Sequence, residues 1–94
     1  MPVYTIEVGT TPKRVLTRNK NRIAYVIVND SSVDVFLGFD SGVRTSGERQ
    51  GLKIYAEGGY WSDEYHKGEV WLVANANTVV TVVEITKEEQ GGGG

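Results

Sequence analysis

The hydrophobic residues of this chain recur at every second position over short stretches, which are separated by glycine, proline, asparagine and aspartate. In Val3–Val8, for example, Tyr4, Ile6 and Val8 fall on one side of an extended chain. This is the periodicity of a β-strand. No window of roughly eleven residues shows the spacing of three to four that marks an amphipathic helix. The pattern therefore predicts a protein built from strands.

Turn-forming residues divide the chain into seven or eight expected strands, with a turn signal every roughly 6–12 residues. The expected strands are Val3–Val8, Lys13–Leu16, Arg22–Asn29, Val33–Phe39, Leu52–Ala56, a short one from Tyr60, Glu69–Ala74 and Thr78–Thr86. This arrangement predicts an all-β fold, namely an antiparallel β-sandwich of the jelly-roll-like or immunoglobulin-like type.

Two of the expected strands are apolar on both faces. In Arg22–Asn29, Ile23, Tyr25 and Ile27 face one way, and the alternate residues that face the other way are also apolar. Thr78–Thr86 has the same character over its middle. A two-layer sandwich buries only one face of each strand. We therefore expect both strands to be central, with the opposing sheet covering one face and another copy of the chain covering the other.

Other strands alternate more strictly, so the pattern predicts which side chains point inward. In Val33–Phe39 we expect Phe39 to face the core together with the other odd-numbered residues, and Phe36 to point outward. In the later strand that carries Trp71 and Val73, we expect these two side chains to point outward.

Composition supports the strand prediction and limits the size of the core. Of the 94 residues, 27 are Val, Ile or Thr, whose branched side chains suit strands, whereas Ala and Leu together contribute only 8. The length allows one domain, which we expect to span 1–90, followed by a glycine tail at 91–94. A domain of this size has a modest core, so we expect a homo-oligomer, with a trimer as the favoured form.

Charge and residue types narrow the range of partners. A net charge of −2 argues against nucleic acid as a partner, and the longest apolar run is too short to cross a membrane. The absence of cysteine excludes disulfides and thiolate metal sites. We therefore expect neither a nucleic-acid nor a membrane partner.

Half of the basic residues of the chain fall within ten consecutive positions. These residues are Lys13, Arg14, Arg18, Lys20 and Arg22. A basic segment can hold phosphate or an acidic protein surface, while the alternative is a solvated loop between two strands. We predict that these five residues contribute to partner binding, with an acidic protein surface as the expected partner.

Tyr60, Trp61 and Tyr65 make the second half of the chain rich in aromatic residues. Such side chains fill cores, anchor protein interfaces or stack on sugars, and the sequence leaves all three roles open. The apolar start of the chain, which includes Val3 and Tyr4, can add to the edge of a sheet in its own copy or in a neighbour. We predict that these five residues contact a partner.

Only one segment combines two carboxylates with an imidazole, through Asp63, Glu64 and His66. Convergent side chains of these types can bind a metal or transfer a proton. The segment is followed by lysine and glycine, however, and has the pattern of a solvated hairpin tip. We therefore predict no catalytic residue, no metal and no cofactor, and expect the chain not to be an enzyme.

Several short motifs follow one another between Arg22 and Glu84. They are Arg22, Val28-Asn29-Asp30-Ser31, Val35-Phe36-Leu37-Gly38-Phe39-Asp40, Val43, and the glycine-containing stretch from Gly51-Leu52 to Gly59. Over about two-thirds of the chain, this order resembles small structural proteins of tailed bacteriophages and related viruses. The longer stretch from Trp61 to Lys67 departs from that pattern and leaves the subfamily open.

The resemblance implies a non-enzymatic virion protein, located on the capsid surface, that binds the major capsid protein or another virion protein. Capsid decoration or cement proteins, head fibres and tail parts are the classes that it covers. The alternative function is a receptor-binding or carbohydrate-binding module that uses surface aromatics such as Tyr60, Trp61 and Tyr65.

Overall fold

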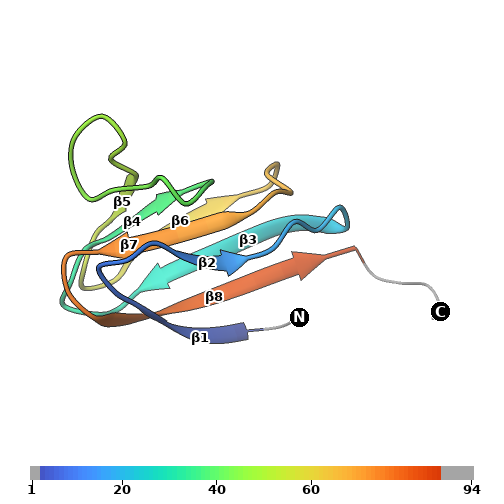
Figure 1. Cartoon of the computed structure of the whole chain (residues 1–94). Helices are drawn as coiled ribbons and strands as arrows, with labels where there is room; N and C mark the ends of the chain where they lie inside the picture. Colours follow the sequence, from blue (N-terminus) through green and yellow to red (C-terminus); the bar gives the residue numbers. More distant parts are fainter. Residues whose placement is uncertain (1–2, 88–94) are drawn as a thin grey trace.

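The structure, a computed structural model, describes residues 3–87, which form eight strands and no helix (Figure 1). The strands are β1 (Val3–Val8), β2 (Lys13–Leu16), β3 (Arg22–Asn29), β4 (Val35–Gly38), β5 (Leu52–Ile54), β6 (Gly59–Asp63), β7 (Val70–Ala74) and β8 (Thr78–Thr86). Within this range no helix is long and apolar enough to cross a membrane. The glycine tail expected at 91–94 lies outside the described residues.

The strands form two antiparallel sheets that pack face to face as a β-sandwich, as the sequence predicted. Sheet A has the strand order β1-β8-β3-β6, and sheet B has the order β2-β7-β4-β5. The chain passes from one sheet to the other at every connection except the one between β4 and β5, which are neighbours in sheet B. Each sheet therefore combines strands from the beginning and the end of the chain. The first and last strands, β1 and β8, pair with each other in sheet A.

The core lies between the sheets and consists of side chains from both. β-Branched residues and leucines dominate it, as the composition predicts for pleated surfaces. Its buried members are Val8, Leu16, Tyr25, Ile27, Val35, Leu37, Ile54, Val70, Leu72, Ala74, Val80 and Val82. Successive residues alternate between core and exterior along each strand, so this core uses one face of each sheet.

A buried asparagine organises the turn after β3. The side-chain amide of Asn29 donates to the carbonyl oxygens of Val33 and Ile54, at 2.8 and 3.0 Å. Its Oδ1 accepts from the backbone N–H and the hydroxyl of Ser31. Every polar atom of this side chain is satisfied, which offsets the free-energy cost of burying an amide. The side chain ties together β3, the turn and β5.

Of the two phenylalanines around β4, Phe36 points outward as expected, whereas the expected inward orientation of Phe39 is wrong. β4 ends at Gly38, so Phe39 lies in the following turn and is 43% exposed. Phe36 does point away from the main core, but it is buried in a second small cluster with Val43 and Val73. The segment from 39 to 51 connects β4 to β5 (Figure 1), and its Val43 packs against Phe36 and Val73 on the outer face of sheet B.

The pattern of β3 also departs from strict alternation at its start. Its register with β8 shifts between Arg22 and Ala24, where Ile23 is an extra residue. The bulge turns Ile23 away from the core, so this side chain is 48% exposed, contrary to expectation. Tyr25 and Ile27 are buried as predicted, and β3 and β8 are the central strands of sheet A.

Candidate interaction surfaces

The structure divides the basic run instead of gathering it into one patch. Lys13 and Arg14 are neighbours on β2, and strand alternation sends their side chains to opposite faces. Arg14 pairs with Glu69 across the outer face of sheet B, at 3.1 Å between Nη1 and Oε2. Arg18 and Lys20 are exposed in the turn that leads to β3.

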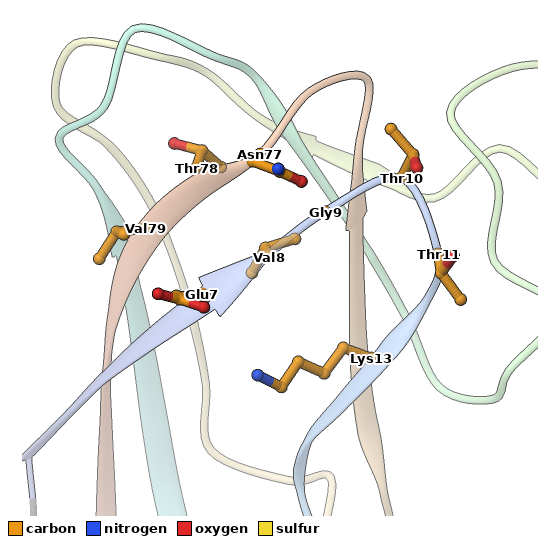
Figure 2. A pocket seen from close by; sticks show the side chains of 9 residues that line it. All are labelled: Glu7, Val8, Gly9, Thr10, Thr11, Lys13, Asn77, Thr78 and Val79. Carbon is orange, nitrogen blue, oxygen red and sulfur yellow. The ribbon is translucent and has the colours of Figure 1, made fainter.

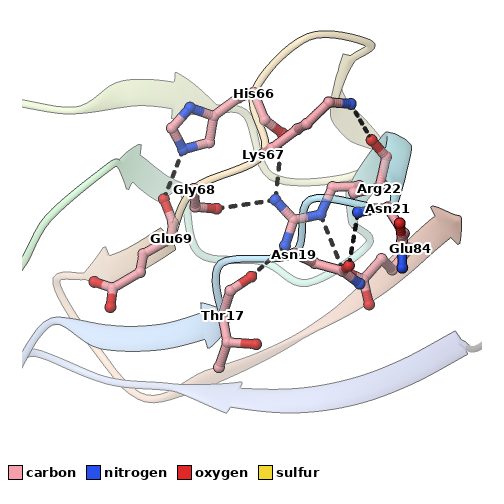
Figure 3. Close-up of polar contacts among 9 residues, drawn as sticks. All are labelled: Thr17, Asn19, Asn21, Arg22, His66, Lys67, Gly68, Glu69 and Glu84. Carbon is pink, nitrogen blue, oxygen red and sulfur yellow. Dashed lines mark hydrogen bonds and ion pairs between the residues drawn. The ribbon is translucent and has the colours of Figure 1, made fainter.

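Arg22 is the most buried of the five basic residues, with only 1% of its surface exposed. Its Nε donates to Glu84 on β8 at 2.9 Å. Its Nη1 donates to the carbonyl oxygens of His66 and Gly68, and its Nη2 donates to the carbonyl oxygen of Thr17 (Figure 3). The guanidinium therefore joins β3, β8 and two turns at one end of the sandwich.

Backbone contacts close the same end. The N–H of Asn19 donates to the carbonyl oxygen of Lys67, and the ammonium of Lys67 donates to the carbonyl oxygen of Arg22. The expectation that Arg22 belongs to an exposed basic surface is wrong, because its donors are used inside the chain. The partner-binding prediction stays open for the other four basic residues.

Trp61 also turns inward, because its strand position places it on the same face as Ile27. Its indole N–H donates to the hydroxyl of Tyr25 at 3.1 Å, and that hydroxyl donates to Asp63 at 3.3 Å. Burial of Tyr25, aided by the charge of Asp63, raises the pKa of its hydroxyl to about 12. These three side chains form a polar network at the margin of the core, where Trp61 is partly buried.

The other two predicted aromatics are exposed but separate. Tyr60 is 70% exposed and lies on the outer face of sheet A, opposite Val28. Tyr65 is 86% exposed in the turn after β6, where its N–H donates to Asp63 Oδ1. With Trp61 turned inward between them, the three aromatics do not make one stacking platform.

The acidic and imidazole side chains of 63–66 have different surroundings. Asp63 accepts from Tyr25 and from the backbone of Tyr65. The His66 ring lies 4.2 Å from the ring of Phe39, centroid to centroid, and its Nε2 is 2.9 Å from the carbonyl oxygen of Glu69. Among the described residues, no group of three or more His, Cys, Asp or Glu side chains could hold a metal ion.

A polar hollow of about 560 Å³ lies where β1 ends and β8 begins. Figure 2 shows Glu7 and Lys13 on its two sides, with threonines and Asn77 completing the rim. In the part of the chain that the structure describes, every buried side-chain nitrogen and oxygen atom has a hydrogen-bond partner. Among the described residues, the hollow therefore has no buried polar atom that needs a ligand as its hydrogen-bond partner.

The outer face of sheet A is almost free of charged side chains. The strand registers place twelve side chains on it: Val3, Thr5, Glu7, Ala24, Val26, Val28, Tyr60, Ser62, Val79, Thr81, Val83 and Ile85. Only Glu7 is charged, although charged residues make up 23% of the chain. At the spacing of strands and residues in a sheet, this face covers about 450 Å². Its residues other than Thr5, Glu7, Tyr60, Ser62 and Thr81 are apolar.

The two sheets differ in what covers their outer faces. Sheet B carries Phe36, Val73 and Trp71 on its outer face, and the segment from 39 to 51 packs on them through Val43. No corresponding segment within residues 3–87 buries the outer face of sheet A, where Val3 and Val79 are 61% and 45% exposed. The sequence had indicated an apolar face outside the core, because β3 and β8 are apolar on both sides.

No family model, curated protein or solved structure matches this chain.

Proposed function

We propose that this chain is a non-enzymatic virion structural protein that self-associates and binds a viral shell, as capsid decoration or cement proteins do. The major capsid protein or another virion protein would be its partner, on the capsid surface. The observation that carries the proposal is the outer face of sheet A, on which Glu7 is the only charged residue. Burial of apolar surface stabilises a contact between two proteins and requires no catalytic group. A protein that only holds capsid subunits together needs such a surface.

We further assign the sandwich to the jelly-roll type. In support, its eight strands divide into two four-stranded sheets of order β1-β8-β3-β6 and β2-β7-β4-β5. Double-sheet jelly rolls of eight strands recur in viral capsid proteins and in lectins. This assignment agrees with the resemblance of the sequence to small virion proteins. A fold alone does not specify function, so the outer face of sheet A is the main support for the proposed function.

The alternative, a carbohydrate-binding or receptor-binding module, has less support. Sugars are bound by aromatic rings that lie next to one another with polar groups around them. Of the three candidate rings, Trp61 packs inward, and Tyr60 and Tyr65 lie on different parts of the surface. The polar hollow beside Glu7 and Lys13 is lined by no aromatic side chain.

Mass spectrometry of purified particles tests the proposal directly. We expect to find the chain in particles of the virus whose genome encodes it. The number of its copies should stand in a fixed ratio to the number of copies of the major capsid protein. Its absence from such particles, or binding of a glycan without binding to particles, would contradict the proposal.

A pair of variants tests which surface is used. Val83→Lys places a charge at the centre of the outer face of sheet A, and we expect it to abolish particle binding. Ser46→Lys adds the same charge to the exposed segment that covers sheet B, and should bind like the parent. Equal binding of both variants would exclude the outer face of sheet A as the contact.

A further inference from the structure

A sandwich of two four-stranded sheets has four edge strands, which here are β1, β6, β2 and β5. An edge strand presents unpaired backbone N–H and C=O groups, which can pair with a strand of another chain. Proteins protect such edges by shortness, charge, proline, bulges or covering segments. The four edges of this protein differ in how far they are protected.

Three of the edges carry recognisable protection. β2 has four residues, begins with Lys13 and Arg14, and contains a register shift. β5 has only three residues, with a lysine in the middle. β6 begins at Gly59, whose N–H is already bonded to the carbonyl oxygen of Tyr55 in the preceding turn, and it ends at Asp63.

β1 has only one of these protections, the charge of Glu7. It has six residues, Val3–Val8, with no lysine, arginine, proline or register shift. One side pairs with β8 over its whole length. Outside the strand ladders, no backbone hydrogen bond among residues 3–87 involves this strand. The other side of β1 therefore offers a complete strand edge.

A cleft of about 520 Å³ lies along the same edge, between β1 and β2, with mainly apolar lining residues and with Thr17 and Glu84 at its polar side. Ile6 and Val15 line it and pack against the core while remaining partly exposed. Tyr4 points the same way as Ile6 along the strand and is 42% exposed. A strand added beside β1 would place its own inward-facing side chains over this cleft.

We propose that two copies of this chain associate by antiparallel pairing of β1 with β1, around a two-fold axis at Thr5. In a continuous sheet, outward-facing residues must lie opposite outward-facing residues. Centring the pair on Thr5 places Val3 opposite Glu7 and Tyr4 opposite Ile6 of the second copy. The two glutamates are then apart, and the four inward-facing Tyr4 and Ile6 side chains cover both clefts.

A second copy of the chain matches this edge in register and in charge. The register is self-complementary, as a two-fold interface requires, and it opposes no like charges. It joins two A sheets into one sheet of eight strands and doubles the outer face, on which Glu7 of each copy is the only charged residue. The inference deepens the self-association in the proposed function and predicts an even-numbered assembly, in place of the trimer favoured by the sequence.

Cysteine cross-linking tests the register, because the chain contains no cysteine of its own. Opposed residues of antiparallel strands have Cα atoms about 4.5–5.5 Å apart, within the range of a disulfide. We expect Thr5→Cys to form a covalent dimer under mild oxidation. Val3→Cys should not, because the two copies of that residue would lie about 13 Å apart. Failure of Thr5→Cys to cross-link, or equal cross-linking of both variants, would overturn the proposal.

Charge variants separate the edge from the outer face. Thr5→Lys places two lysines opposite each other on the axis and should weaken dimerisation about fivefold, measured by sedimentation equilibrium. Thr81→Lys is the matched control, because Thr81 is the partner of Thr5 on β8 and lies away from the edge. If Thr81→Lys weakens dimerisation as much, or if the parent is a monomer or a trimer, the proposal is wrong. These measurements use the purified chain alone, so their failure leaves the particle-binding test of the proposed function intact.

Discussion

Arg22 and Glu84 form an ion pair at one end of the core, with 2.9 Å between Nε and Oε2. The arginine side chain is 1% exposed and the glutamate side chain 12%. Charges this far from water are tolerated only when they are paired and hydrogen-bonded. Here the same guanidinium also binds three backbone carbonyl groups, so the pair is part of the structure that closes this end.

Arg22→Met should lower the free energy of unfolding by about 3–5 kcal/mol, because it leaves Glu84 and the carbonyl groups without their donor. Urea unfolding followed by tryptophan fluorescence measures the effect. The double variant with Glu84→Gln should be more stable than the single variant, since no charge then remains unpaired. A loss below about 1 kcal/mol in Arg22→Met would show that the pair is not important for stability.

The raised pKa of Tyr25 predicts a loss of stability at alkaline pH. Its pKa is about 12 in the folded chain, compared with 10.0 for an ordinary tyrosine. Below about pH 10 the residue is protonated in both states and has no effect. Between about pH 10 and 12 the unfolded chain loses this proton first, so stability falls by up to about 1.4 kcal/mol per pH unit. Urea unfolding across this range should show a steeper decline in the parent than in Tyr25→Phe, and equal slopes would contradict the assignment.

Glu69 should respond to changes in its two neighbours. The indole N–H of Trp71 donates to Oε1 at 3.0 Å, and this bond, followed by the one from Arg14, lowers the pKa of the carboxyl group. The stability linked to this shift is present above the ordinary glutamate pKa and is lost as pH falls through the lowered value. NMR titration of the carboxyl carbon should show a higher pKa in Trp71→Phe, and a smaller rise in Arg14→Gln. An unchanged pKa in Trp71→Phe would exclude the indole as the main cause.

Gly38 allows the segment from 39 to 51 to lie against sheet B. A Cβ atom at Gly38 would lie 2.5 Å from Cβ of Val43, which is far inside van der Waals contact. Gly38→Ala should therefore lower the free energy of unfolding by about 1–3 kcal/mol in urea titrations. Adding Val43→Ala should recover part of this loss, although that change alone is destabilising. Strict additivity of the two single effects would show that the contact is absent.

The strand positions of this protein were determined by local sequence. β1, β2, β3 and β8 have the bounds that alternation and turn residues predicted, because the period of two and the turn preferences of glycine, proline and asparagine act over a few neighbouring residues. The apolar character of β3 and β8 on both faces was likewise visible in the sequence, and it pointed to the uncovered face of sheet A.

Only the tertiary structure decided which apolar or charged side chains are covered. In the sequence, Arg22 is one of five basic residues in a row of ten positions. In the fold, β8 brings Glu84, 62 positions later in the chain, beside it. The sequence left the role of Trp61 open between core, interface and sugar binding, and the pairing of its strand with β3 brings its indole to Tyr25. Phe36 points outward, as its place in the alternation requires, yet a segment that begins three residues later buries it. Alternation fixes the face on which a side chain lies, but the pairing of distant strands and the path of the loops determine what packs against that face.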